Sequence, residues 1–496
     1  MADFSDYAVV VGLECHVQLC THSKLFSQAP NRYGAAPNTL VAEVDTGLPG
    51  SLPVLNRQAV ECALRLGTAL RCDIQQTSSF ARKHYFYPDL PKGYQITQGD
   101  HPICLGGTLP FDGEAGEASV ALERIHLEED AGKNLHEAGS GVSYVDYNRA
   151  GAPLLEVVTK PSLHCAQDAM AAARSLRAIV MALRICDGNM QEGSLRIDVN
   201  VSVHKSGSNQ LGVRTETKNL NSIRFLGQAV AYETRRQILQ LRAGEPVVQE
   251  TRLWDPQRKE TRPLRGKEQD HDYRYCPEPD LPPLAIPSAM LEQVRDTQPE
   301  LPQHKRERFC QTLGLRPYDA HILTSDQGLA DYFETALRTH EHPKGLANWI
   351  LNEVLRVAKH QESARVGDDD GDAFSCPIPP AAVATLVKLV DEGTISGHIA
   401  KQVFEELAHD PRKTPEEIVQ AKGWHMQRDK AALQRIVQDV LRDHPREVTK
   451  YLAGKTRVMG YLMSQIMRRG EGRVDPKEAT ACLRDKLEEA REPGMG

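Results

Sequence analysis

A chain of 496 residues exceeds what one hydrophobic core usually holds, so we expect two or three domains. Hydrophobic residues make up 40% and charged residues 26%, which is ordinary for a soluble globular protein. The 60 basic residues are outnumbered by 67 acidic ones, and the net charge of −7 does not indicate a nucleic-acid-binding protein, although a local basic patch can still bind one.

The chain shows no sign of export or of membrane insertion. Its start, MADFSDYAVV, lacks the basic segment of a secretory signal, and no apolar run is long enough to span a bilayer. The 11 cysteines are scattered without a CxxC pair, which favours reduced thiols. We therefore expect a cytoplasmic protein that makes no membrane contact.

The first predicted strand, VVGLECHVQL at 9–18, contains an acid and an imidazole two residues apart. Residues i and i+2 of a strand face the same side, so Glu14 and His16 are presented together. A half-exposed strand with a polar outer face explains the pair, and so does a pair of metal ligands or proton carriers. Both interpretations are open at this point.

The segment FARKHYFYPDLPKGYQITQ at 80–98 interleaves aromatic rings with basic groups. Tyr85 and Tyr87 alternate with cations such as Lys83, and Lys92 follows after two prolines. This composition is typical of a binding loop, although an Ω-loop packed by its own rings would look the same.

Acidic residues gather at two further places. RIHLEEDAGK at 124–133 concentrates acids after His126, and Glu156 lies inside the apolar run of GAPLLEVVTK. A carboxylate within such a run is costly unless it is paired or binds a cation. These acids therefore favour a binding site for a cation.

Two predicted strands, SLRIDVNVSV and GVRTETKNL, carry mixed charge on one face. The polar set is Arg196, Asp198 and Asn200 on the first, and Arg214, Glu216 and Lys218 on the second. If the strands pair as a hairpin, these faces join. Carboxylates, an imidazole, Arg and Lys on one sheet suggest a magnesium–nucleotide site, whereas zinc is disfavoured because no Cys/His cluster is available.

Helical patterns at 56–70, 166–183 and 226–244 interrupt these strands without a regular βαβ order, which predicts an α+β fold with an antiparallel sheet. After the proline cluster at 277–287 the pattern becomes helical, interrupted by an acidic linker at 363–380. We expect an N-terminal domain over 1–292, a helical domain over 293–405 and a helical tail over 406–496.

The tail has a local excess of positive charge. Its basic residues are Lys450, Lys455, Arg457, Arg468, Arg469 and Arg473. The acid that accompanies them is Glu471. A polyanion-binding surface and a solvated helix face both explain this excess.

The chain resembles the GatB/GatE family, the B subunits of aspartyl/glutamyl-tRNA(Asn/Gln) amidotransferases, over nearly its whole length. The matching segments, in the order of the family, include GLECHVQL, RKHYFYPDLPKGYQITQ, HLEEDAGK, NRAGAPLLEVV, EGSLRIDVNVSV, TKNLNS, DYRYCPEPDLPPL and GKTRVMGYLMSQIM.

The resemblance implies a cradle domain with the glutamine synthetase-like catalytic fold, followed by a helical domain and a YqeY-like tail. It implies a carbon–nitrogen ligase that uses glutamine as amide donor. ATP phosphorylates the side-chain carboxylate of Glu-tRNA(Gln) or Asp-tRNA(Asn), and ammonia then displaces the phosphate. Ammonia comes from an A subunit, and a C subunit completes the heterotrimer.

The resemblance also implies roles for individual residues. The Mg²⁺ ligands correspond to His16, Glu129 and Glu156, with Glu14 beside them as a fourth catalytic residue. Strand alternation puts Glu129 and His126 on different faces of the same strand. This assignment therefore requires a β-bulge or turn between them.

The remaining implied roles concern the substrates. Lys83 and Lys92, with Tyr85 and Tyr87, match the ammonia path and acceptor end. Asn221 joins the six polar residues of the paired strands in the nucleotide floor. Lys455, Arg457, Arg468, Arg469 and Arg473 of the tail would contact tRNA.

One departure concerns a zinc site. Some family members carry four cysteines in the loop at 27–45, where this chain has Ser27, Ala29, Ala42 and Asp45. We therefore expect ATP and Mg²⁺ as cofactors and no structural zinc.

Two other functions fit parts of the sequence. A free-standing ligase for a small carboxylate would explain the sheet but has no use for a basic tail. A non-catalytic tRNA scaffold would explain the tail, but an anion-binding surface gains nothing from Glu14, Glu129 and Glu156.

Overall fold

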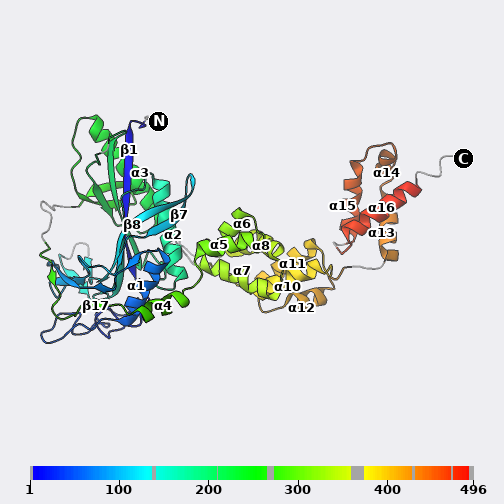
Figure 1. Ribbon diagram of the computed structural model, residues 1–496. Helices are drawn as coiled ribbons and strands as arrows, with labels where there is room; N and C mark the ends of the chain where they lie inside the picture. Colours follow the sequence, from blue (N-terminus) through cyan, green and yellow to red (C-terminus); the bar gives the residue numbers. More distant parts are fainter. Residues whose placement is uncertain are drawn as a thin grey trace. The chain divides into compact units, whose positions relative to one another are not determined.

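The computed structural model describes residues 4–136, 141–208, 210–264, 273–358, 374–426, 430–470 and 473–490. They divide into two compact units, one reaching to His304 and one beginning at Lys305, each described here by itself (Figure 1). No helix in these ranges has the length and apolar character needed to cross a membrane.

The first unit is built on one large sheet. The central strands are β13 (Thr215–Lys218), β12 (Leu195–Lys205), β1 (Tyr7–Gln18), β11 (Pro153–Thr159) and β8 (Gly116–Glu129), in that spatial order. Outside β13 lie β14 (Thr251–Asp255) and β15 (Glu260–Pro263), and beyond β8 lie β5 (Tyr94–Thr97), β4 (Ala81–His84) and β16 (Cys276–Pro277). The central neighbours pair antiparallel as predicted, and β13–β14 is a parallel exception.

Shorter strands complete the unit. On the large sheet, β2 (Asp73–Ile74) pairs with β6 (Cys104–Leu105), and β7 (Thr108–Gly113) pairs with β8. Two small sheets pair β9 (Lys133–His136) with β10 (Ser143–Asp146), and β3 (Thr77–Ser78) with β17 (Leu284–Ala285).

Strand alternation separates an apolar face from a polar face. Leu13, Cys15 and Val17 of β1 are buried, while Glu14 and His16 between them are partly exposed. The apolar face packs with helices α1 (Arg57–Ala69), α2 (Ala166–Ala182) and α3 (Ile223–Arg242) in one core. Strands β12 and β13 pair antiparallel, which meets the condition under which their polar faces join.

The second unit is helical and contains two hydrophobic cores. Helix α4 (Ser288–Asp296) still belongs to the first unit. The first helical core is built from α5 (Pro302–Gln311), α6 (Pro317–Leu323), α7 (Gln327–Thr339), α8 (Pro343–Trp349), a π-helical turn (Ile350–Val354), α10 (Pro380–Asp391), α11 (Gly397–His409) and α12 (Pro415–Lys422). The other is built from α13 (Lys430–Asp443), α14 (Pro445–Leu452), α15 (Val458–Arg469) and α16 (Pro476–Glu489).

The expected boundary after residue 405 falls inside α11. Phe404 and Leu407 of this helix pack in the same core as Val419, against which Trp424 also packs. The separate tail core begins only at Leu433. Of the expected linker at 363–380, the residues up to 373 lie outside the described ranges.

A buried ion pair organises the loop at 27–45, where no structural zinc was expected. The ammonium of Lys24 lies 3.1 Å from the Asp45 carboxylate, and both side chains are buried. Ser27 Oγ and the Ala42 amide donate to the same carboxylate oxygen at 3.1 and 2.9 Å. Gly151 has φ +83°, and a side chain on it would lie within 2.5 Å of Asp45. Asp45 thus ties together Lys24, Ser27 and the backbone at Ala42.

We predict that Asp45→Ala destabilises the first unit by about 3–5 kcal/mol, because it leaves the Lys24 ammonium buried without its counter-charge. Urea unfolding of the full chain would measure the loss. Glu43→Ala, which removes an exposed acid of the same loop, is the control and should leave the transition unchanged. An unchanged transition for Asp45→Ala would show that the pair does not hold the loop.

Candidate functional site

Four strands contribute one residue each to a polar row across the sheet. The register sets Arg196 of β12 opposite His16 of β1, His16 opposite Glu156 of β11, and Glu156 opposite His126 of β8. Side chains directly opposite on neighbouring strands lie within contact distance. Antiparallel pairing thus assembles, at the middle of the sheet, groups that are far apart in the sequence.

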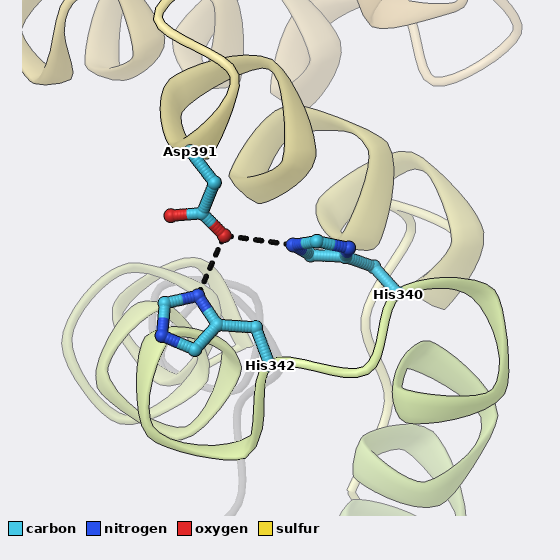
Figure 2. A group of neighbouring side chains, drawn as sticks. All are labelled: His340, His342 and Asp391. Carbon is cyan, nitrogen blue, oxygen red and sulfur yellow. Dashed lines mark hydrogen bonds and ion pairs between the residues drawn. The ribbon is translucent and has the colours of Figure 1, made fainter.

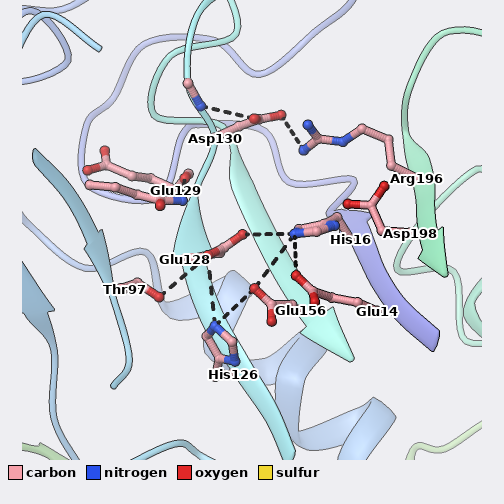
Figure 3. A network of polar contacts seen from close by, with 12 residues as sticks. Glu14, His16, Thr97, His126, Glu128, Glu129, Asp130, Glu156, Arg196 and Asp198 are labelled. Carbon is pink, nitrogen blue, oxygen red and sulfur yellow. Dashed lines mark hydrogen bonds and ion pairs between the residues drawn. The ribbon is translucent and has the colours of Figure 1, made fainter. Parts of the chain in front are cut away.

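His16 lies among three carboxylates (Figure 3). Its Nε2 atom is 3.6 Å from Glu156, 3.7 Å from Glu128 and 3.9 Å from Glu14. His126 Nε2 approaches two of them, at 3.5 Å from Glu156 and 3.8 Å from Glu128. Glu14, His16 and Glu156 form one group that could hold a metal ion, and His126, Glu128 and Glu156 form another.

The bulge that would bring Glu129 to this face is not present. The pairing of β8 with β11 runs without a break from His126 opposite Glu156 to Glu129 opposite Pro153. Because alternate residues face one side, Glu128 shares the face of His126 and Glu129 points away. The register therefore contradicts the expected bulge, and Glu128 rather than Glu129 lies on the polar face with His16 and Glu156.

Glu129 has a different set of contacts. Its carboxylate pairs with Lys92 and accepts a 2.8 Å hydrogen bond from the Ile96 amide. Both side chains are buried, and burial raises the pKa of Glu129 even though Lys92 opposes this. Lys92 was expected near the ammonia path. Its ammonium instead pairs with Glu129, and Lys92 is not among the residues that line the cavity beside His16.

The pKa values of Glu14 and Glu128 are shifted in opposite directions. Burial, together with the charge of Glu156, raises the pKa of Glu14. Burial also acts to raise the pKa of Glu128, but the hydrogen bond from His126 and the nearby charges of His16 and Lys83 outweigh it and lower the pKa to about 2. Carboxylates that repel one another on one face favour a bound cation.

A cavity of about 330 Å³ opens onto this cluster. It is lined by Glu14, His16, Lys83, Tyr85, Asp89, Gln95, Glu128, Asp130, Ala131, Arg149, Leu154, Glu156, Arg196 and Lys218. Acids and cations therefore face the same enclosed space, as a site for a metal ion and an anionic substrate requires. A larger cavity of about 970 Å³ lies between helices of the second unit, away from these carboxylates.

Most cations of the cavity are already engaged by acids. Lys218 Nζ lies 2.8 Å from Asp198 and 2.9 Å from Glu216, and Arg196 lies 2.8 Å from Asp130. These contacts place the expected nucleotide-floor residues beside the carboxylate cluster.

Lys83 has a different environment. Its ammonium lies 4.7 Å from the centre of the Tyr273 ring. Burial lowers the pKa of Lys83, but surrounding phenols and the carboxylates of Glu128 and Glu156 outweigh burial, so the pKa is raised and the side chain is charged. The charged Lys83 ammonium lies near the carboxylates of Glu128 and Glu156 and lines the same cavity, so it can contact an anion bound there.

Several predicted residues lie outside the cavity. Asn200 sits opposite Glu216 on the neighbouring strand, whereas Arg214 and Asn221 are exposed beyond the ends of β13. Tyr85 lines the cavity, but Tyr87, packed edge to face on it at 6.2 Å, is 54% exposed. The aromatic loop is therefore divided between the cavity and the surface.

The basic tail is less unbalanced than its sequence suggests. Lys455, Arg457, Arg468 and Arg469 are all exposed. However, Asp443 of α13 lies 2.6 Å from Arg469, and Glu447 of α14 lies 3.5 Å from Lys450. Folding of the tail thus brings Asp443 to Arg469, whereas Glu447 lies three residues before Lys450 on the same helix.

No individual role was assigned to His126, Glu128, Asp130 or Arg149, although the acids at 124–133 were expected to favour a cation site. The sequence contains a pattern that marks two of these residues, His126 and Glu128. His126 and Glu128 are separated by one residue on a strand, the same spacing that marked Glu14 and His16. Arg149 approaches Asp130 to 3.4 Å from a loop, and no strand rule predicts such a contact.

Comparisons with known proteins cover nearly the whole chain. A family model described as the GatB/GatE catalytic domain matches residues 9–292, and one described as the GatB domain matches residues 331–487. The chain belongs to the GatB/GatE family. The catalytic-domain match contains every carboxylate and imidazole of the cluster around His16, so the family resemblance and the geometry single out the same part of the chain.

Its relatives in this family are named as the B subunit of aspartyl/glutamyl-tRNA(Asn/Gln) amidotransferase. The protein from Anaeromyxobacter sp. (strain K) is 48% identical over 489 residues, which cover 97% of this chain and 99% of the relative. The protein from Geotalea uraniireducens (strain Rf4) is 47% identical over 484 residues, again 97% and 99% of the two chains. The protein from Janthinobacterium sp. (strain Marseille) is 46% identical over 490 residues with the same coverage.

We predict that Glu128→Gln weakens binding of Mn²⁺, used as a probe for Mg²⁺, by at least about tenfold, because it removes a ligand charge from the cluster. Glu129→Gln should leave Mn²⁺ affinity within about twofold of the parent chain, since its carboxylate faces Lys92. Titration followed by electron paramagnetic resonance would measure both. The reverse ranking would restore Glu129 as the metal ligand.

Proposed function

We propose that the chain is the B subunit of an aspartyl/glutamyl-tRNA(Asn/Gln) amidotransferase and that the polar face of its sheet performs the ATP-dependent amidation. The observation that carries the proposal is the cluster of three carboxylates around His16, inside a chain that matches its relatives end to end. Phosphoryl transfer needs little covalent chemistry from a protein, and consists mainly of positioning and charge stabilisation.

The reaction has two steps. The side-chain carboxylate of Glu-tRNA(Gln) or Asp-tRNA(Asn) attacks the γ-phosphorus of ATP, and ADP leaves. Ammonia then attacks the carbonyl carbon of the acyl phosphate, inorganic phosphate leaves, and the nitrogen gives up a proton as the amide forms. The site must therefore neutralise phosphate charge and hold two anions side by side.

The donor set fits a hard divalent cation. Glu14, Glu128 and Glu156 offer carboxylate oxygens around the His16 imidazole, and Mg²⁺ takes oxygen ligands together with substrate phosphates. When bound, Mg²⁺ would neutralise charge on the phosphates. His126 would act as a positioning residue, because it contacts Glu128 and Glu156 from the neighbouring strand.

The cations of the cavity would bind the anionic substrates. Lys83 is charged and faces Glu128 and Glu156, so it can contact the phosphoryl group or the substrate carboxylate between them. Lys218 and Arg196 are held by Asp198 and Asp130, which fixes their positions in the cavity wall. Charge-assisted contacts of this kind supply much of the stabilisation in phosphoryl transfer.

The proposal extends to partners. An A subunit would release ammonia from glutamine, and a C subunit would complete the heterotrimer. The exposed cations of the helical tail, which include Lys455 and Arg457, would contact the tRNA backbone. A small-molecule ligase would have no need for this surface.

The first experiment uses the chain assembled with its A and C subunits, ATP, MgCl₂ and ammonium chloride, with Glu-tRNA(Gln) and free glutamate in competition. Ammonium bypasses the glutaminase, so we expect Gln-tRNA(Gln) and no free glutamine. Free glutamine would indicate a small-carboxylate ligase. Absence of both products with tight tRNA binding would indicate a scaffold.

In the same assay, Glu128→Gln should lower kcat about 100-fold or more while tRNA affinity stays within about twofold, because the carboxylate acts on the phosphoryl step. Glu123→Gln removes an exposed acid from the same strand and is the matched control. We expect parental activity for it. Loss of tRNA binding in Glu128→Gln would mean that this residue is structural.

The pH dependence of cation affinity should follow Glu14. Burial and Glu156 raise its pKa above the usual 4.5, so at mildly acid pH a cation must displace a proton from it. Affinity for Mn²⁺ therefore rises as the pH rises through the pKa of Glu14, by up to about one logarithmic unit per pH unit for one proton. Glu14→Gln should flatten this slope and Glu123→Gln should not. An unchanged slope in Glu14→Gln would exclude Glu14 as the titrating group.

A further inference from the structure

A second group of possible metal ligands lies in the helical unit, outside the proposed active site. It consists of His340, His342 and Asp391. His340 directly follows α7, His342 precedes α8, and Asp391 is the last residue of α10. The chain is extended at His340, with φ −146° and ψ 116°, so the two imidazoles, one residue apart, reach the same side.

The three side chains converge on one point (Figure 2). Oδ2 of Asp391 lies 2.7 Å from His340 Nε2 and 2.6 Å from His342 Nδ1. The three candidate ligand atoms all lie within 4.8 Å of one another. At these distances the two ring nitrogens donate hydrogen bonds to the Asp391 carboxylate, and a metal ion would take the place of those protons.

The backbone holds this arrangement firmly. The His340 amide donates to the Ala336 carbonyl at 3.1 Å, and the His342 amide donates to the His340 carbonyl at 2.9 Å. Gly345 in the first turn of α8 makes room for the ring, because a side chain there would lie 2.6 Å from His342 Nδ1. Helices α7, α8 and α10 also share one hydrophobic core.

The charge distribution favours a cation at this point. Asp391 places a carboxylate at the C-terminus of α10, the end of a helix dipole that favours positive charge. Two imidazoles and one carboxylate, with side chains 21%, 44% and 33% exposed, leave room for water as further ligands. Imidazole-rich sites of this kind suit zinc, cobalt or nickel rather than magnesium.

We propose that His340, His342 and Asp391 form a binding site for a transition-metal dication of the zinc class, which joins the α7–α8 corner to α10. This proposal departs from the expectation that the chain has no structural zinc, which rested on the loop at 27–45 and on the Cys/His content of the sequence. This partly exposed site with open coordination positions arises only on folding, because Asp391 is remote in sequence from the two histidines. It is independent of the proposed amidation.

The test titrates the full chain, stripped with a chelator and desalted, with Co²⁺ and with Zn²⁺ against a chromophoric chelator. We expect one equivalent to bind with the visible absorption of nitrogen-ligated Co²⁺. Asp391→Asn and His342→Gln should lose this equivalent and its band. The bound equivalent should persist in His16→Gln, which alters the metal-ligand candidates of the sheet.

His398→Gln is the matched control, since it removes an exposed histidine of α11 outside the cluster, and it should bind as the parent does. Retention of the equivalent in folded Asp391→Asn or His342→Gln would overturn the proposal and leave an ion-pair cluster only. If circular dichroism shows both variants unfolded, Gly345→Ala decides. Its methyl group displaces the His342 ring without removing a ligand, so loss of the band supports the site and retention contradicts it.

Discussion

The electrostatic repulsion among Glu14, Glu128 and Glu156 is the constraint on which the catalytic unit depends. Three carboxylates surround one imidazole on a largely buried face, where like charges are costly. They stay together because each is a side chain of a strand in the middle of one antiparallel sheet. Neighbouring strands on both sides fix the backbone positions of these acids, so the strands cannot separate them. A bound cation would relieve the repulsion.

The apolar face of the sheet supplies the rigidity for this arrangement. Leu13, Cys15 and Val17 alternate with the functional residues of β1 and are anchored in the core against three helices. A shift of one residue in the register would exchange the two faces and bury the charges among helices. The hydrophobic pattern therefore specifies the active-site register as well as the fold.

Two other acidic side chains of the chain, Asp45 and Asp391, are neutralised in different ways. The Lys24–Asp45 pair holds the loop at 27–45 by a buried ion pair. In the helical unit, Asp391 instead collects two imidazoles, the ligand set of a transition metal. The two places differ in how the carboxylate is neutralised. At Asp45 the Lys24 ammonium supplies the positive charge, whereas at Asp391 a bound metal dication would supply it.

The sequence by itself determined the strand alternation and the family, because both follow from local residue order, and it left the pairing of the two mixed-charge strands open. It also singled out Glu14, His16 and Glu156, which the structure brings together. It misassigned Glu129, since the family pattern was placed on an expected bulge, whereas strict alternation would have pointed to Glu128.

Only the tertiary structure decided the rest. Arg149 reaches Asp130 from a loop, Asp443 pairs with Arg469 across the tail, and Asp391 joins His340 and His342 from another helix. The physical reason is the same in each case. Strand alternation and helical periodicity specify which face a residue occupies, but contacts between separate elements depend on how their cores pack, which local residue order does not contain.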